Sequence, residues 1–138
     1  MIRAHVTRLA YLAAFVNGLA AALTFFVPDI LTGPAGANGN ARGTALVMLL
    51  IASPLLAGAA TVARREAPRA ALVVLGALAY LAYNDVLLLF ATPFNRLFLL
   101  YTTAFGLTIF TAIEALRTLD VAGVVDRLPR LPARGLAV

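Results

Sequence analysis

The chain has 138 residues, 62% of them hydrophobic, and a mean hydropathy of +0.94. An average soluble domain is about 45 to 50% apolar, and a domain of this size leaves much of its surface in contact with water. The composition therefore excludes a water-soluble globular fold and predicts a membrane protein. The formal net charge is +5, and all the basic residues are arginines apart from one histidine. The arginines are scattered and lack interleaved exposed aromatic residues, so we expect no binding of nucleic acid.

Four long apolar runs predict an all-α fold, a bundle of four transmembrane helices. Each run is close to the ~20 residues that an α-helix needs to cross the ~30 Å hydrocarbon core. The first run is longer than the about 7 to 15 residues of a signal-peptide core, so we expect it to be retained as a helix. The predicted membrane domain covers residues 1–117, and residues 118–138 form a cytoplasmic tail with prolines and arginines. Within the domain we expect helices at about residues 8–27, 43–63, 69–92 and 93–117.

Residues at the ends of the runs and within the second run indicate turns and a kink. Residues 31–43 are rich in glycine and asparagine, which predicts a loop in water. Pro54 should kink the second helix near its centre, and the Ser53 hydroxyl is available to bond a carbonyl that the proline leaves free. Thr92-Pro93 has the form of an N-cap followed by proline at the first helical position. We therefore expect a tight hairpin between the third and fourth helices.

The arginines predict the orientation in the membrane. Nine of them lie at the N-terminus, between the second and third helices, or in the tail, whereas only Arg42 and Arg96 lie in the other two loops. Cytoplasmic loops carry an excess of arginine and lysine. We therefore expect both termini to be cytoplasmic and the protein to lie in the inner (cytoplasmic) membrane of a bacterial cell.

A short polar segment interrupts the third apolar run. Asp85 is the only charged residue between residues 70 and 92, and an ionisable group inside a membrane span is a functional-site hypothesis by default. Arg96 follows the predicted turn, and a long arginine side chain reaches along apolar surface, so we expect an ion pair between Asp85 and Arg96. This pair is either a structural contact that fixes the hairpin or a gated ion, substrate or proton site. We expect a supporting polar network of Asn17, Tyr80, Tyr83, Asn84, Asn95 and Tyr101.

Small and polar residues predict which helix faces meet. Asn84 and Asp85 point about 100° apart on a helix, so one of them must face a different neighbour, for which Asn17 is the candidate. Closely packed membrane helices place small residues at their interfaces. The first helix offers Ala10, Ala14, Gly18 and Ala22 at every fourth position, and the fourth helix offers Thr102, Thr103, Gly106 and Thr111.

The residue inventory excludes several chemistries. There is no cysteine and only one histidine, His5, so the chain cannot form a Cys/His metal site or ligate haem with paired histidines. The absence of lysine excludes a Schiff base to a cofactor. Ser53 is the only serine and lies in mid-span, far from His5, which excludes a Ser-His hydrolase. We expect no cofactor, no metal and no catalytic residue, and the sequence favours a function without catalysis.

One resemblance covers most of the chain. Residues 38–45, 83–84 and 90–101 resemble the corresponding segments of a group of small bacterial four-helix integral membrane proteins of unassigned function. The resemblance implies the membrane fold but no activity. The chain is also similar in size to the small multidrug transporters, but it has Asn17 and no glutamate in its first helix.

Three functions are compatible with these observations. The first, which the sequence favours because four short helices leave little room for a path within one monomer, is a non-catalytic accessory or scaffold subunit that packs against a larger membrane assembly. The second is an oligomeric carrier or channel for an ion or small solute that uses Asp85, with Asn84 and Asn17 along the path. The third is a lipid- or quinone-binding protein with a pocket near Tyr80, Tyr83 and Tyr101. We expect contact with membrane lipid in every case, and a protein partner or a homo-oligomer.

Overall fold

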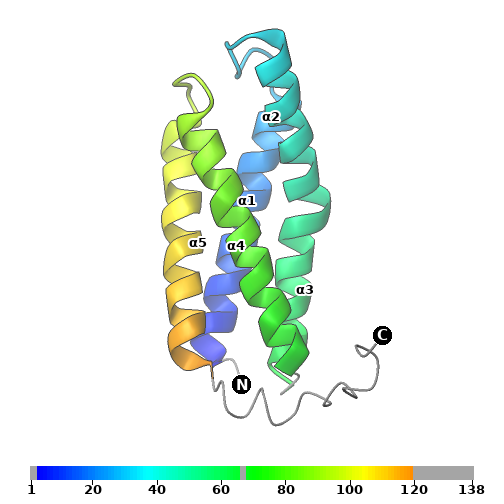
Figure 1. The fold of residues 1–138 in the computed structure, drawn as a ribbon, viewed down its shortest axis with the longest axis vertical. Helices are drawn as coiled ribbons and strands as arrows, with labels where there is room; N and C mark the ends of the chain where they lie inside the picture. Colours follow the sequence, from blue (N-terminus) through cyan, green and yellow to red (C-terminus); the bar gives the residue numbers. More distant parts are fainter. Residues whose placement is uncertain (1–2, 66–67, 120–138) are drawn as a thin grey trace, which may run out of the picture.

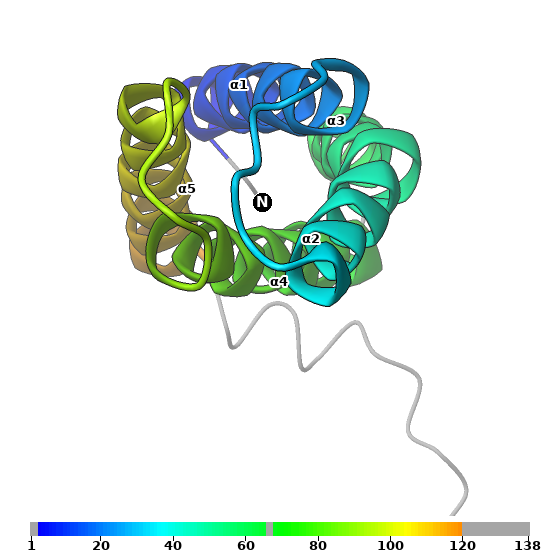
Figure 2. The same ribbon diagram turned by 90° about the horizontal axis from the view of Figure 1, so that it is seen from above.

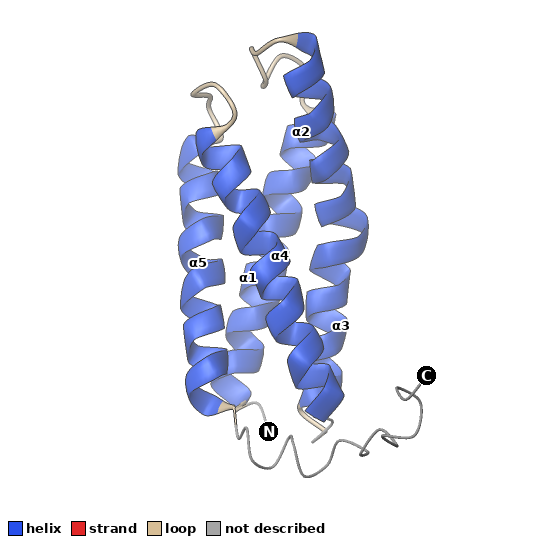
Figure 3. Cartoon of the chain, viewed as in Figure 1, coloured by secondary structure: helices blue, strands red, loops and turns tan. Residues whose placement is uncertain are grey.

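The computed structural model describes residues 3–65 and 68–119, which form four helical rods packed side by side (Figure 1). Outside the helices the described residues form turns and loops, with no strand (Figure 3). The predicted tail lies outside the described residues from residue 120 onward. The rods are α1 (Ala4–Phe26), the continuous series α2 (Ala35–Val47), π-helical η1 (Met48–Ala52) and α3 (Ser53–Ala63), then α4 (Pro68–Phe90) and α5 (Phe98–Thr118).

The rods alternate in direction, and each packs against the next in the chain. Seen from above, α1, α3, α4 and α5 surround a common axis, with α5 returning beside α1 (Figure 2). As a result α1 and α4 lie diagonally opposite one another. The N-terminus of α1 and the C-terminal end of α5 share one end of the bundle, which we call the terminal end. Residues 27–34 and 91–97 form the other end, which we call the loop end.

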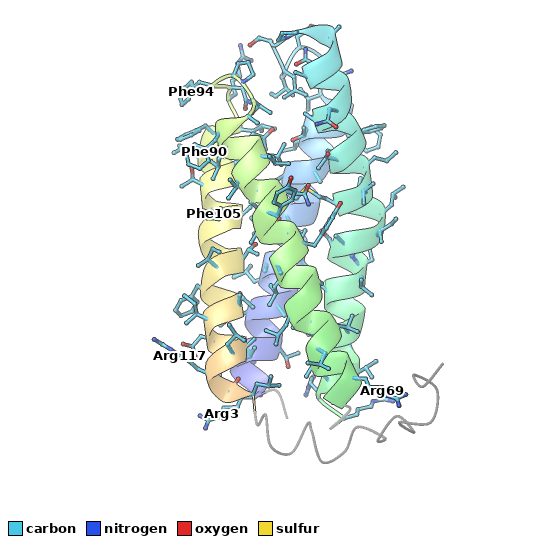
Figure 4. All side chains as sticks on the ribbon, in the orientation of Figure 1. Arg3, Arg69, Phe90, Phe94, Phe105 and Arg117 are labelled. Carbon is cyan, nitrogen blue, oxygen red and sulfur yellow. The ribbon has the colours of Figure 1, made fainter. Side chains whose placement is uncertain are left out.

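The interior consists mainly of small side chains, and the exterior is apolar. Alanines from all four rods are buried, which lets the backbones approach closely, as membrane helices require. Large apolar side chains such as Phe15 and Leu99 are exposed instead, and Phe90 and Phe94 project outward near the loop end (Figure 4). All four rods are long and apolar enough to span a membrane. The predicted all-α bundle of four transmembrane helices is therefore confirmed.

The second rod differs from the prediction at its start. Helix begins at Ala35, whereas we expected a loop over residues 31–43. The glycines and asparagines of this segment are tolerated because they occupy an exposed extension of the rod, where Asn38 caps the preceding turn by donating to the carbonyls of Leu31 and Gly33. Local propensity is a weak signal when the chain on one side already forms a packed helix.

The predicted irregularity at Pro54 takes the form of a widened turn. The Ser53 N–H donates to the carbonyl of Met48, five residues earlier, and the π-helical segment Met48–Ala52 ends there. Proline has no N–H to donate to the preceding turn, and a π-helical turn is one way in which a helix accommodates this loss. The Ser53 hydroxyl does not bond a freed carbonyl, since it has no hydrogen-bond partner among the described residues.

The hairpin between α4 and α5 is longer than predicted. Thr92 does not cap the next helix, because its hydroxyl donates to the carbonyl of Leu88 in the last turn of α4. The loop runs over residues 91–97, and α5 begins at Phe98. Asn95 forms the turn instead: its Oδ1 accepts from the Leu97 N–H, and its backbone carbonyl accepts from the Phe98 N–H.

Candidate functional site

Four buried polar residues, one from each rod, lie in the interior of the bundle. Among the described residues the interior also holds several threonines that bond to carbonyls of their own helix, which is an ordinary way to satisfy a hydroxyl in lipid. Four of the buried polar residues are set apart because they are neighbours on four different rods. We call them the central polar layer: Asn17 of α1, Ser53 of α3, Asp85 of α4 and Thr108 of α5.

An interhelical hydrogen bond joins α1 to α5 within this layer. The Asn17 side chain donates from Nδ2 to Thr108 Oγ1 at 2.9 Å and to the carbonyl of Ala13 at 3.0 Å. Because Thr108 accepts from Asn17, its own hydroxyl hydrogen is free, and the Asp85 carboxyl lies close to it. Thr108 thus lies between Asn17 of α1 and Asp85 of α4.

Ser53 lies at the same level on the other side of α1. A methyl group placed at Gly18 would be 3.8 Å from both Cβ and Oγ of Ser53, so Ser53 faces the α1 backbone one residue from Asn17. A Cβ at position 18 would make only ordinary van der Waals contact with Ser53, so the approach of α3 does not require glycine there. The widened turn of η1 ends at Ser53.

Three oxygen atoms of the layer are buried without a hydrogen-bond partner in the described part of the chain: Asn17 Oδ1, Ser53 Oγ and Asp85 Oδ2. The exposed fractions of these residues are 0%, 6% and 1%. An unsatisfied buried polar group costs about 1 to 3 kcal/mol, and a charged one costs more. Proteins rarely retain such groups without a reason, and three of the five unpartnered buried side-chain atoms of the described residues belong to this layer, the others being Thr7 Oγ1 and Arg42 Nε.

The predicted ion pair between Asp85 and Arg96 is wrong. Both ion pairs within the described residues involve Glu114, and neither involves Asp85. Arg96 lies in the loop over residues 91–97 with its side chain exposed, whereas Asp85 is directed into the bundle. The longer hairpin explains the difference, since it places Arg96 outside the bundle instead of in the first turn of α5.

The remaining residues of the predicted network divide into three groups. Asn84 is buried, but it donates to the carbonyl of Tyr80 in its own helix and does not contact Asn17. Tyr80 and Tyr83 are exposed on the outer side of α4, with Tyr83 64% exposed. Asn95 forms the hairpin turn. None of these residues joins the central polar layer.

Tyr101 has a separate polar contact nearer the loop end. Its hydroxyl is 2.7 Å from Thr24 Oγ1, and the Thr24 hydroxyl is also 2.7 Å from the carbonyl of Ala20. Tyr101 is among the largest fully buried side chains of the described residues. This contact joins α1 to α5 above the Asn17 to Thr108 hydrogen bond, so two interhelical hydrogen bonds hold this pair of helices together.

Sequence analysis missed the role of Thr108 and assigned Ser53 a different one. The spacing of Ala104, Thr108, Thr111 and Ala115 places these small residues on one face of α5, and all four are buried. That pattern was available in the sequence. Of the four residues that we expected at this interface, only Thr111 is buried, whereas Thr102, Thr103 and Gly106 are exposed.

An ionic cluster lies at the terminal end. Glu114 Oε1 is 3.2 Å from Arg117 Nη1, and Glu114 Oε2 is 3.5 Å from His5 Nε2. The contact with Arg117 is an ordinary pair between residues three apart on a helix. The contact with His5 joins the first turn of α1 to the end of α5. Within the described ranges no three His, Cys, Asp or Glu side chains are placed to share a metal ion.

Fold and interior together define a small multi-pass membrane protein whose four-helix bundle contains a central polar layer. Comparison with known proteins found no family model, curated protein or solved structure that matches the chain.

Proposed function

We propose that the protein is a carrier or channel for an ion or small solute, and that the central polar layer is its binding site. The observation that carries the proposal is the set of three unpartnered oxygens on Asn17, Ser53 and Asp85, each at least nine-tenths buried. A structural ion pair would have explained Asp85 without a ligand, and no such pair is found among the described residues.

The cost of the layer supports a functional role. A charged side chain costs about 2.5 to 3.5 kcal/mol at the bilayer centre on insertion scales and less toward an interface. Asp85 lies in the last third of α4, so its cost is smaller than that range. The Thr108 hydroxyl compensates part of that cost, whereas a leucine at position 85 would avoid it altogether. Acidic residues inside spans commonly mark ion pathways and proton relays. A passing ion or solute would give all three oxygens a transient partner.

The other two predicted functions have less support. The accessory-subunit function stays a prediction, because the apolar outer faces of the helices suit lipid as well as a protein partner. A hollow of about 230 Å³ lies between α2 and the end of α4, lined by residues such as Ala41, Thr44 and Leu88. It does not include Tyr80, Tyr83 or Tyr101, which were expected to line a lipid or quinone pocket.

We further propose the orientation that the arginines predict. Arg3, Arg69 and Arg117 lie at the terminal end (Figure 4), whereas Arg96 belongs to the loop end. The positive-inside rule then places the terminal end in the cytoplasm of a cell whose inner membrane contains the protein. Oligomerisation is part of the proposal, because four short helices leave little room for a complete path within one monomer.

The test is passage through liposomes that contain the purified protein. Vesicles are assayed for protons, for alkali cations and for small neutral solutes such as glycerol and urea. The proposal predicts passage of at least one of these above the level of protein-free vesicles, and loss of that passage in Asp85→Asn. Asp29→Asn is the matched control, since Asp29 is exposed in the loop that follows α1. Passage that is absent, or unchanged in Asp85→Asn, would refute the proposal. In that case, recovery of a stoichiometric partner in mild detergent would favour the accessory subunit.

A further inference from the structure

The geometry points to a single alkali cation as the ligand of the central polar layer; this inference rests on the proposed function and names its substrate class. The unpartnered atoms of the layer share one chemical character. Asn17 Oδ1, Ser53 Oγ and Asp85 Oδ2 are all oxygens with lone pairs to offer. No nitrogen donor of the layer is left unpartnered, so the layer presents acceptors to an occupant.

The orientation of Asn17 is determined by its hydrogen bonds. Its amide nitrogen already donates to Thr108 Oγ1 and to the carbonyl of Ala13. Reversing the amide would place its oxygen against the Ala13 carbonyl, which is also an acceptor, and that contact is repulsive. The Oδ1 atom must therefore remain the unpartnered one. A neutral carbonyl oxygen inside a bundle is a typical ligand for sodium or potassium ions.

Charge indicates a monovalent ion. The layer contains one carboxylate and no basic side chain, so its formal charge is −1. A buried charge is tolerated when an opposite charge offsets it. One alkali ion neutralises the layer, whereas a divalent ion would leave a net positive charge in the interior. The absence of a cluster of three His, Cys, Asp or Glu side chains in the described ranges agrees with this choice.

The backbone beside Ser53 can supply a further oxygen ligand. The π-helical segment Met48–Ala52 immediately precedes Ser53, and Pro54 has no N–H to donate to that segment. A carbonyl in a widened turn before a proline is freer than one in a regular helix. Transporters with interrupted helices use such carbonyls to coordinate sodium.

The experiment measures the apparent melting temperature of the full-length protein in detergent. Samples contain NaCl, LiCl, KCl or choline chloride at equal ionic strength, so that salt effects on surface charge are held constant. Choline serves as the reference, because its methylated nitrogen offers no bare charge for oxygen ligands to coordinate. We expect at least one alkali cation at a saturating concentration to raise the melting temperature by about 3 to 6 °C over choline.

Three variants make the assay specific. Asp85→Asn should abolish the cation response, and Asp29→Asn should retain it in full. If Asp85→Asn does not fold, Ser53→Ala tests the same site, because it removes one ligand. This change should raise the cation concentration at half-maximal response by about 10-fold, which corresponds to loss of roughly one favourable contact.

The outcomes distinguish this inference from the proposed function. An equal melting temperature in all four salts would overturn the inference, and so would a response that persists in both layer variants. Passage of protons or glycerol through liposomes without any alkali response would leave the proposed function standing and refute the alkali cation. A specific alkali response without passage in liposomes would support the site and refute transport.

Discussion

Thr108→Val tests whether the hydroxyl of Thr108 connects α1 to α4. Valine has nearly the same shape as threonine but neither donates nor accepts a hydrogen bond. The change removes the 2.9 Å hydrogen bond from Asn17 Nδ2 and the contact with the Asp85 carboxyl. Interhelical hydrogen bonds in membranes contribute about 0.6 kcal/mol on average and up to about 1.7, and leaving a buried polar group unpartnered costs about 1 to 3 kcal/mol. Asn17 keeps its second acceptor, the Ala13 carbonyl. We therefore expect the free energy of unfolding to fall by about 1 to 2 kcal/mol.

The assay is unfolding in mixed micelles by increasing sodium dodecyl sulfate, followed by far-ultraviolet circular dichroism. The control is Thr103→Val on the same helix, since Thr103 is exposed and bonds only to the carbonyl of Leu99 in its own helix. The control should change the free energy of unfolding by less than about 0.5 kcal/mol. Equal losses in the two variants would refute the reasoning, because they would show that the buried contacts contribute no more than a local bond. In a double-mutant cycle, Asn17→Ala should be less destabilising in the Thr108→Val background than in the wild type.

Three further changes follow from the same contacts. Tyr101→Phe should lower the free energy of unfolding by about 1 kcal/mol through loss of the hydrogen bond to Thr24. The control Tyr83→Phe, at an exposed position, should have almost no effect. Equal effects of the two changes on unfolding in micelles would contradict this prediction. Arg96→Gln should leave the free energy of unfolding within about 0.5 kcal/mol of the wild type, since Arg96 forms no ion pair with Asp85. A loss above about 2 kcal/mol would show that the two residues do form an ion pair. Asn95→Ala should cost about 0.5 to 1.5 kcal/mol in the same assay because the Leu97 N–H loses its acceptor, and an unchanged midpoint would show that the turn does not need this side chain.

The number of spans could be predicted because lipid imposes a simple requirement. Each span needs about 20 apolar residues, and the chain meets this four times. The limits of the helices were harder to predict. Helix begins at Ala35 in a segment rich in glycine, and α5 begins at Phe98 and not beside Pro93. In both cases residues typical of turns were interpreted from the local sequence alone. Packing and the side chain of Asn95 determine where these two helices begin.

The partners of Asp85 could not be predicted from its position in the sequence. Arg96 is the nearest basic residue along the chain, and proximity in sequence suggested the pair. The actual neighbour, Thr108, is on α5 and depends on the rotation of two helices about their axes. The same difficulty applies to Asn17, which we expected to face Asn84 or Asp85. Because α1 and α4 are diagonally opposite, Asn17 reaches Asp85 only through Thr108.

Disulfide cross-linking tests the central polar layer most directly, because the chain contains no cysteine and every introduced pair is unambiguous. Two double variants are compared after mild oxidation in detergent: Asn17→Cys with Thr108→Cys, and Asn17→Cys with Asn84→Cys. The arrangement of helices predicts rapid intramolecular cross-linking of the first pair and none of the second. Cross-linking of positions 17 and 84, with none between 17 and 108, would contradict the arrangement on which the proposed site depends.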